Sequence, residues 1–170
     1  MAIRKKEILT HPWGCVHDEH SRILILGSFP SPKSRQNGFY YGHTQNLFWR
    51  MLALVLNKPE PSADRVSKTA FLLQNQIALW DVLYSCEISG ADDNTITNPI
   101  ANDFSTLFKK ATIKAVFTTG KKATALFKKL CSEIYGFEPF YLPSTSPANR
   151  AMQKSEEFLT QWRKINEFLA

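Results

Sequence analysis

Four short apolar segments along the chain constrain its fold more than any other feature. They cover residues 22–27, 77–80, 113–118 and 140–142, and the first of them ends in Gly27. Runs of this length and composition are typical of strands that are buried on both faces of a parallel sheet. Longer segments with apolar residues at helical spacing separate them. The alternation predicts parallel βαβ units in a three-layer α/β/α sandwich, with a central four-stranded, mainly parallel sheet.

The segments between these strands are expected to form the covering helices. The predicted helices span residues 45–57, 62–75, 102–108, 120–131 and 153–169, with Ser62 and Asn102 as candidate caps of the second and third. Residues 89–99 are polar and rich in Asn and Asp, which predicts a loop. A chain of 170 residues is long enough for one domain, 1–170, with a substantial core.

Composition narrows the class of protein. The formal net charge of +6 favours a polyanionic partner, of which nucleic acid is the common example. No apolar run reaches the length of a membrane span, and no apolar signal region follows the basic N-terminus, so we expect a cytoplasmic protein without a membrane partner. The three cysteines form no CxxC pair, which argues against a zinc or iron–sulfur site. We therefore expect no metal and no cofactor.

In folds of this kind, ligands bind outside the carboxyl ends of the parallel strands. The first strand is followed by a turn from Gly27 to Ser31, where Gly and Pro allow the backbone to approach a ligand closely. The spacing of this turn is not that of a P-loop. Asp81 follows the second strand, and it is either a hydrogen-bonded buried carboxylate or an acceptor for a ligand N–H.

The segment from Gly38 to Trp49 combines glycines, aromatic residues and Asn46. Its aromatic rings can line a flat slot, and an aromatic face stacks on a nucleobase with about 1–3 kcal/mol per base. Asn46 offers both an acceptor and a donor. Alternatively, Phe48 and Trp49 belong to the core of a helix that begins near residue 45. His43 either forms part of a pocket wall or braces the loop.

Two further segments suit phosphate groups. Gly120 and Lys121 open a helix after the third strand, and a helix N-terminus with a lysine favours an anion. The fourth strand leads into the rigid, hydroxyl-rich stretch 142–150, which ends in Arg150. Such a loop can lie against a phosphodiester backbone.

In this order, the segments resemble the uracil-DNA glycosylase superfamily over about residues 22–150. The pieces that carry the resemblance are the Gly27–Ser31 turn, the H-x-x-N-x-F-W segment at 43–49, Asp81, the G-K-x-A helix start at 120–123 and the Pro/Ser loop. The matches Y-Y-x-H-x-x-N-x-F-W, A-L-W-D-V-L and L-P-S-T-S-P-A-N are similar to the hypoxanthine-DNA glycosylase branch. The resemblance implies a fold of the uracil-DNA glycosylase type.

The resemblance also implies roles for individual residues. Phe29 stands where most of the superfamily has a water-positioning Asn or Asp, and Ser144 stands where the most active uracil enzymes have His. In the hypoxanthine branch the catalytic role falls on the residue that is Asn46 here. The implied base-binding residues are Gly27, Ser28, Phe29, Tyr41, His43, Phe48 (as the stacking platform) and Asp81. The implied DNA contacts are Ser31, Lys121, Ser144, Thr145, Ser146, Pro147, Asn149 and Arg150.

The implied activity is hydrolysis of the N-glycosidic bond of a deaminated base in DNA, as a step of base excision repair. Hypoxanthine is the base implied first and uracil second, in double- or single-stranded DNA, by a monofunctional and monomeric enzyme. The enzyme would flip the damaged nucleotide out of the stack. Two alternatives remain open: a mismatch-specific uracil/thymine glycosylase, and a catalytically inactive DNA-binding member of the superfamily.

Overall fold

The computed structural model describes residues 6–90 and 92–169. Its central sheet consists of four parallel strands in the order β3-β2-β6-β7. The strands are β2 (Ile23–Gly27), β3 (Ile77–Asp81), β6 (Ala115–Thr119) and β7 (Phe140–Leu142). The four predicted strands are therefore confirmed, as is the parallel sheet.

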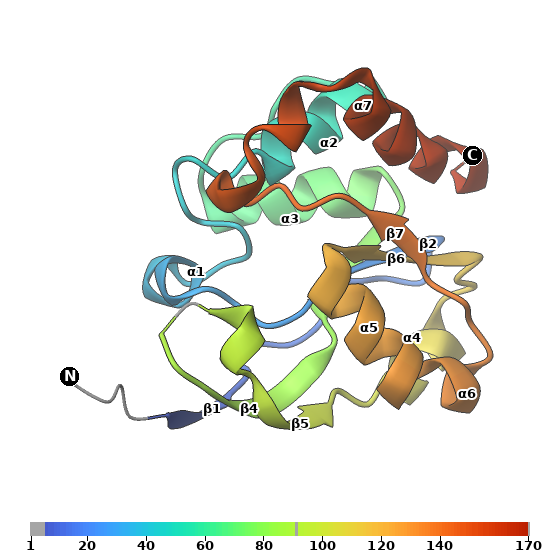
Figure 1. The fold of residues 1–170 in the computed structure, drawn as a ribbon. Helices are drawn as coiled ribbons and strands as arrows, with labels where there is room; N and C mark the ends of the chain where they lie inside the picture. The colour runs from blue at the N-terminus through green and yellow to red at the C-terminus, as the bar shows by residue number, and fades with distance from the viewer. Residues whose placement is uncertain (1–5, 91, 170) are drawn as a thin grey trace.

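Helices cover both faces of this sheet (Figure 1). Along β2, Ile23 and Ile25 belong to one apolar cluster, and Leu24 and Leu26 belong to the other, because alternate side chains of a strand point to opposite faces. The first cluster includes residues of α2 (Phe48–Leu56), α3 (Arg65–Gln74) and α7 (Glu156–Arg163). The second includes residues of α4 (Ser105–Lys110) and α5 (Lys121–Leu130). These layers match the predicted α/β/α sandwich.

The sequence patterns did not predict a second sheet. It is antiparallel, has the order β1-β4-β5 and consists of β1 (Glu7–Thr10), β4 (Leu83–Ile88) and β5 (Thr97–Ala101). The loop expected over 89–99 is therefore only partly correct, because it contains the 3-10 helix η1 (Asp93–Thr95) and the start of β5. The outer strands β1 and β5 lack the continuous apolar run by which a buried strand is recognised.

Several predicted helix boundaries also differ. The helix expected from residue 45 begins at Phe48, and Asp64 rather than Ser62 caps α3 by accepting the N–H of Ser67 at 2.8 Å. Phe104, rather than Asn102, is the N-cap residue of α4. Two short helices, α1 (Pro32–Asn37) and α6 (Ser132–Tyr135), complete the set, and the C-terminal helix is divided into η3 (Met152–Lys154), α7 and η4 (Lys164–Phe168).

The parallel strands bring the segments that follow them to one edge of the sheet. Gly27 at the end of β2 lies opposite Asp81 at the end of β3, and Thr119 at the end of β6 lies opposite Leu142 at the end of β7. In the described part of the chain, no helix combines the length and the apolar character that a membrane crossing requires.

Candidate active site

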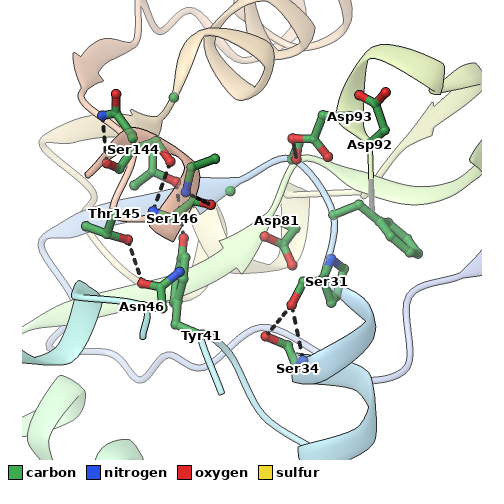
Figure 2. Close-up of a pocket in the computed structure, with 18 of the residues that line it drawn as sticks. Ser31, Ser34, Tyr41, Asn46, Asp81, Asp92, Asp93, Ser144, Thr145 and Ser146 are labelled. Atoms are coloured by element: carbon green, nitrogen blue, oxygen red, sulfur yellow. Dashed lines mark hydrogen bonds between the residues drawn. The ribbon is translucent and has the colours of Figure 1, made fainter. Parts of the chain in front are cut away.

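An open pocket of about 820 Å³ lies at the carboxyl edge of the central sheet. Its walls come from the turn after β2, the end of β3, the loop before α2, the η1 segment, the start of α5 and the loop after β7 (Figure 2). The pocket therefore lies where strand polarity predicts a ligand site. Its volume is sufficient for a nucleobase and its sugar.

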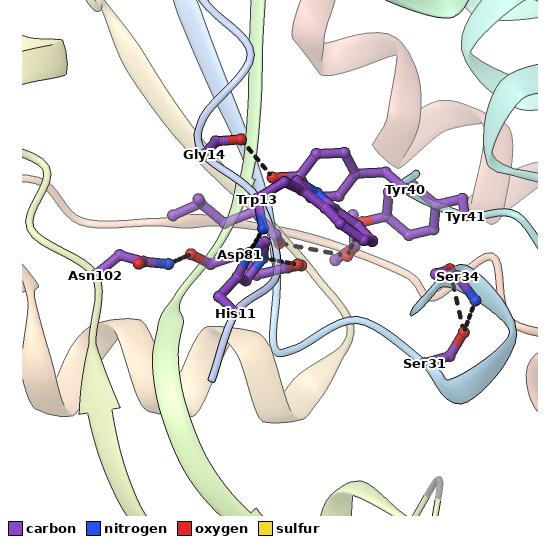
Figure 3. Close-up of polar contacts among 11 residues, drawn as sticks. His11, Trp13, Gly14, Ser31, Ser34, Tyr40, Tyr41, Asp81 and Asn102 are labelled. Atoms are coloured by element: carbon purple, nitrogen blue, oxygen red, sulfur yellow. Dashed lines mark hydrogen bonds and ion pairs between the residues drawn. The ribbon is translucent and has the colours of Figure 1, made fainter. Parts of the chain in front are cut away.

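The carboxylate at the end of β3 is held by a histidine from the N-terminal region (Figure 3). Oδ2 of Asp81 lies 2.8 Å from Nε2 of His11, and both side chains are buried. Because Nδ1 of His11 accepts the backbone N–H of Trp13 at 3.3 Å, the ring proton resides on Nε2 and is donated to Asp81. The side-chain amide of Asn102 donates to the backbone carbonyl of Asp81 at 2.9 Å. These contacts fix the orientation of the carboxylate.

The second carboxylate oxygen of Asp81 remains available to a ligand. Among the residues that the structure describes, none donates a hydrogen bond to Oδ1. This oxygen lies close to Gly27: a Cβ added there would stand 2.5 Å from Oδ1 and 3.1 Å from the hydroxyl of Tyr41. Only glycine leaves enough space at this position. Asp81 thus presents a fixed acceptor for an N–H group in the pocket.

The aromatic ring at the pocket wall belongs to Tyr41 rather than to Phe48. The two rings stack with centroids 3.9 Å apart and 10° between their planes. Phe48 is completely buried and has edge-to-face contacts with Trp49 and Trp162. The prediction that Phe48 stacks on a bound base is therefore wrong, because Tyr41 covers its ring and lines the pocket in its place.

Tyr41 adopts an unusual backbone conformation, with φ of 51°. A non-glycine residue in this region costs about 1–3 kcal/mol, and such strain clusters at functional sites. The hydroxyl forms a 3.1 Å hydrogen bond with Oγ1 of Thr119. Burial first and the nearby Asp81 carboxylate second raise the pKa of Tyr41, so its hydroxyl stays protonated at neutral pH.

His43 is not part of the pocket wall. Its Nδ1 accepts the backbone N–H of Gln45 at 3.0 Å, and its carbonyl accepts the N–H of Asn46 at 2.9 Å. The base-binding role predicted for His43 has no support from this position and stays a prediction. The histidine instead braces the loop that carries Asn46.

The side chain of Asn46 has one engaged end and one free end. Oδ1 accepts the hydroxyl of Thr145 at 2.8 Å and the backbone N–H of Phe48 at 2.9 Å. Because a backbone N–H can only donate, the atom that faces Phe48 must be the amide oxygen. Nδ2 has no partner among the described residues, and Asn46 lines the pocket. Toward a ligand, Asn46 is therefore a hydrogen-bond donor.

The loop after β7 contributes to the pocket through Ser144, Thr145, Ser146 and Asn149. Thr145 is buried and its hydroxyl is engaged with Asn46, so its contact with DNA stays a prediction. The amide of Asn149 donates to the carbonyl of Ser144 at 3.0 Å, which keeps the loop compact. Ser146 caps the 3-10 helix η2 (Pro147–Asn149). Pro147 is not part of the pocket wall, and its contact with DNA stays a prediction.

The turn after β2 forms part of the pocket wall. Phe29 is almost completely buried and packs edge-to-face on His11, with ring centroids 5.8 Å apart. Ser31 caps α1 by accepting the N–H of Ser34 at 3.2 Å. The hydroxyl of Ser28 donates to Oδ2 of Asp93 at 2.8 Å. Lys121, the first residue of α5, also lines the pocket.

Two residues of this site, His11 and Asp93, were not predicted from the sequence. His11 carries no local signal, because its partner lies 70 residues away in the chain. Asp93 belongs to a pair of adjacent aspartates in a segment that was interpreted as a plain loop. Burial raises the pKa of Asp93 and the Asp81 charge adds to this effect, whereas the Ser28 hydrogen bond and the Lys122 charge lower it.

A smaller groove of about 320 Å³ adjoins the pocket, and Asn46 borders both. Three cations line it: Arg50, Arg150 and Lys154. Its one acidic residue, Glu60, lies 3.8 Å from Nε of Arg50 in an exposed ion pair. Arg150, which does not reach the larger pocket, belongs to this groove. The excess of positive charge suits a phosphodiester next to the pocket.

A metal ion has no evident site in the described part of the chain. No group of three or more His, Cys, Asp or Glu side chains among residues 6–90 and 92–169 is arranged to hold one.

Comparisons of the sequence with protein families and with curated proteins agree with one another. The model of the uracil DNA glycosylase superfamily matches residues 15–170. Among curated proteins, the hypoxanthine DNA glycosylase of Methanosarcina barkeri is 36% identical over 143 residues, which cover 84% of this chain and 89% of the relative. The hypoxanthine DNA glycosylase of Methanosarcina acetivorans is 34% identical over 151 residues, which cover 88% of this chain and 93% of the relative.

A solved structure agrees with these relatives. It is a solution NMR structure of a Methanosarcina acetivorans protein described as a candidate uracil DNA glycosylase. It aligns with a TM-score of 0.76 and 31% identity, covering 94% of this chain and 96% of the other.

Proposed function

The chain belongs to the uracil DNA glycosylase superfamily, and we propose that it is a monofunctional glycosylase that removes hypoxanthine from DNA, with uracil as a second substrate. It is a DNA glycosylase for deaminated bases, in keeping with its family and its two relatives named for hypoxanthine. The observation that carries the choice of base is the free Oδ1 of Asp81, which His11 fixes next to the ring of Tyr41.

Asp81 supplies the discrimination between deaminated and normal purines. Hypoxanthine has an N–H at N1, where adenine has a lone pair. A carboxylate oxygen accepts the first and repels the second. Because Oδ2 of Asp81 accepts from His11 and Oδ1 is a carboxylate oxygen, the side chain presents an acceptor and no donor toward adenine. Uracil carries an N–H at N3, so the same oxygen accommodates it.

The pocket can hold the base in one plane. A flipped base would stack on the outer face of Tyr41, whose ring is kept in place by Phe48 behind it and by Thr119 at its hydroxyl. Base–aromatic stacking contributes about 1–3 kcal/mol, which offsets part of the cost of leaving the helix. The strained backbone at Tyr41 is consistent with a ring that is positioned for a ligand.

Asn46 acts on the leaving base as a donor. As the C1′–N9 bond breaks, negative charge builds on the purine, and Nδ2 of Asn46 is free to donate to a base acceptor. Backbone N–H groups of the Gly27–Ser31 turn can donate to the base from the other side. A preorganised donor of this kind is typically worth about 3–4 kcal/mol in the transition state.

The DNA backbone would contact the rim of the pocket and the adjoining groove. Lys121, at the start of α5, and Arg150, in the groove, are placed for phosphates on two sides of the flipped nucleotide. Ser144, Ser146 and Asn149 lie between them on the loop after β7. Contacts of this type position the DNA without reading its sequence.

A panel of duplexes tests the proposal. Each duplex carries deoxyinosine, uracil, thymine opposite guanine, or adenine, and alkali cleaves any abasic site after incubation. We expect cleavage with deoxyinosine first and uracil second, and none with adenine. Cleavage of the duplexes with uracil and mismatched thymine, but not of the duplex with deoxyinosine, would favour a mismatch-specific glycosylase. DNA binding without any abasic site would favour the inactive alternative.

Asn46→Asp is the sharpest variant for the catalytic role. The new carboxylate keeps an oxygen that can accept from Thr145 and Phe48, so the loop stays braced. It replaces the donor that faces the pocket with a negatively charged acceptor. We expect the single-turnover rate to fall by roughly 10²- to 10³-fold, as for loss of one transition-state donor. An unchanged rate would move the catalytic role away from Asn46.

A further inference from the structure

The pocket needs a group that takes a proton from the attacking water, and Asn46 cannot be that group. Both acceptor positions of its Oδ1 are occupied, by the hydroxyl of Thr145 and by the N–H of Phe48. Its free end can only donate. Asp81 is engaged by His11 on one oxygen and, under the proposed function, by the base on the other. Two further carboxylates line the pocket, Asp92 and Asp93. Asp92 is exposed and accepts the N–H of Asn94, whereas Asp93 is partly buried and bonded to Ser28 of the turn after β2.

Asp93 is held in position at the end of β2. It is the first residue of η1 and lines the pocket, and its Oδ2 accepts the hydroxyl of Ser28 at 2.8 Å. No described residue donates to its Oδ1. Ser28 directly precedes Phe29, whose buried ring offers no polar group. The carboxylate next to this turn is thus provided by η1, from a distant part of the chain (Figure 2).

The charges around Asp93 are few and lie on different elements. Asp81 on β3 and the neighbouring Asp92 raise its pKa in addition to burial, while Ser28 on the β2 turn and Lys122 on α5 lower it. The net effect is a raised pKa, which makes the ionised carboxylate a better proton acceptor than an exposed aspartate.

Two further titratable groups are close enough to sense its charge. Burial and the Asp93 carboxylate raise the pKa of the Cys86 thiol on β4 to about 11, although Arg35 lowers it. Asp93 also contributes to the raised pKa of Tyr41. Both groups stay neutral at physiological pH, so neither competes with Asp93 for the proton.

We propose that Asp93 is a catalytic residue of this pocket and that its carboxylate receives the proton of the water that attacks C1′. This inference rests on the proposed function. As the C1′–N9 bond breaks, its electron pair leaves with the base, and the water oxygen bonds to C1′. One water proton passes to Asp93, which leaves a hydroxyl on the sugar. The departing base, held by Asn46, takes this proton from Asp93, which restores the carboxylate.

Asp93→Asn tests the inference because the amide oxygen can still accept from Ser28 but cannot take up a proton. In single-turnover reactions with a deoxyinosine duplex, we expect the rate to fall by roughly 10²- to 10⁴-fold, as for loss of a general base. Affinity for the duplex should stay equal or increase, because the variant removes a negative charge near the DNA phosphates.

Asp103→Asn is the matched control. It removes the same charge from an exposed aspartate outside the pocket, and the asparagine oxygen can still accept the N–H of Ser105 at about the 2.9 Å seen for Asp103. Its rate should stay within about twofold of the wild-type rate, as for an ordinary surface change. An Asp93→Asn rate within threefold of wild type would overturn the inference and leave the proposed function intact. A wild-type protein that releases no base would overturn both.

The pH profile separates proton transfer from a purely structural role. The wild-type rate should rise with pH through the pKa of Asp93 and then level off, whereas Asp93→Asn should lack this rise. In addition, formate should restore part of the activity of Asp93→Ala. A rise that persists in Asp93→Asn, or an Asp93→Ala variant that formate does not rescue, would contradict the assignment.

Thermal unfolding tests whether Asp93→Asn still folds. The raised pKa of Asp93 decides whether the variant should have a higher or a lower Tm than the wild type. Because the fold raises the pKa of Asp93, the protonated carboxyl is favoured in the native state, and this contribution to stability is lost as pH rises through the native pKa. Asp93→Asn should therefore have a higher Tm than wild type at neutral pH, and the difference should shrink toward acid. A lower Tm at neutral pH would mean that Asp93 has a structural role instead.

Discussion

Replacing Asp81 with Asn should change which base the pocket accepts. His11 determines the result, because its Nδ1 accepts the N–H of Trp13 and its Nε2–H needs an acceptor at 2.8 Å. The new amide must therefore turn its oxygen toward His11 and its NH₂ toward Gly27 and the pocket. A fixed acceptor becomes a fixed donor, while the buried pair stays hydrogen-bonded and the fold is retained.

Two contributions determine how far Asp81→Asn should lower kcat/KM for deoxyinosine. Loss of a hydrogen bond to a charged group costs about 1.5–3 kcal/mol, and an N–H left facing the N1–H of hypoxanthine adds about 1–3 kcal/mol. Together they correspond to a fall in kcat/KM for deoxyinosine of roughly 10²- to 10⁴-fold, since each 1.36 kcal/mol is a factor of ten. For adenine, the same donor meets the N1 lone pair, so the ratio of the two rates should shift strongly toward adenine.

The assay compares the wild type and Asp81→Asn on deoxyinosine and deoxyadenosine duplexes of identical sequence, with excess enzyme and alkaline cleavage of abasic sites. Equal Tm values would show that the His11 contact survives in the variant. If the variant processes deoxyinosine at the wild-type rate, or if both duplexes lose reactivity in the same proportion, Asp81 does not read the base and the proposed recognition is wrong.

Further variants test the other parts of the site. Tyr41→Ala should weaken productive binding by the stacking energy of one base, about 1–3 kcal/mol, visible mainly in the concentration dependence of single-turnover rates; an unchanged dependence would mean that the base does not stack there. Phe48→Ala should instead lower the unfolding free energy by about 3–5 kcal/mol, measured by denaturant titration, because Phe48 is fully buried. Gly27→Ala should cost about 1–3 kcal/mol by overpacking and abolish most activity, because its Cβ would stand 2.5 Å from Oδ1 of Asp81; full activity would refute this close approach. Arg150→Gln should reduce the slope of log affinity against log salt by about 1 without changing lesion preference, and an unaltered slope would exclude a phosphate contact.

The central sheet could be predicted because burial leaves a direct trace in the sequence. Strands such as β2 are apolar at every position, so each appears as a short continuous run. Strands β1 and β5 were missed because they are partly exposed and mix polar with apolar residues, and β5 even contains Pro99. Their pairing with β4 depends on contacts between distant segments, which local patterns do not record.

The position of the candidate site could be predicted from the sequence, but several of its contacts could not. Those contacts also join segments that are far apart in the chain. Strand polarity placed Asp81 and Asn46 at one edge, but it could not show that His11 approaches from 70 residues away. The local pattern also could not decide which of two aromatic residues faces the pocket. Phe48 lies at the start of α2 and points into the core, whereas the positive φ of Tyr41 turns its ring over Phe48.

Analysis of the reaction products tests the central claim most directly. The wild-type protein is incubated with a deoxyinosine duplex, and mass spectrometry identifies both the released small molecule and the remaining strand before any alkali is added. We expect free hypoxanthine and an unbroken strand that has lost the base and carries a hydroxyl at C1′. An unchanged strand, or a strand cleaved without alkali, would contradict the assignment of this pocket to hydrolysis by a monofunctional DNA glycosylase.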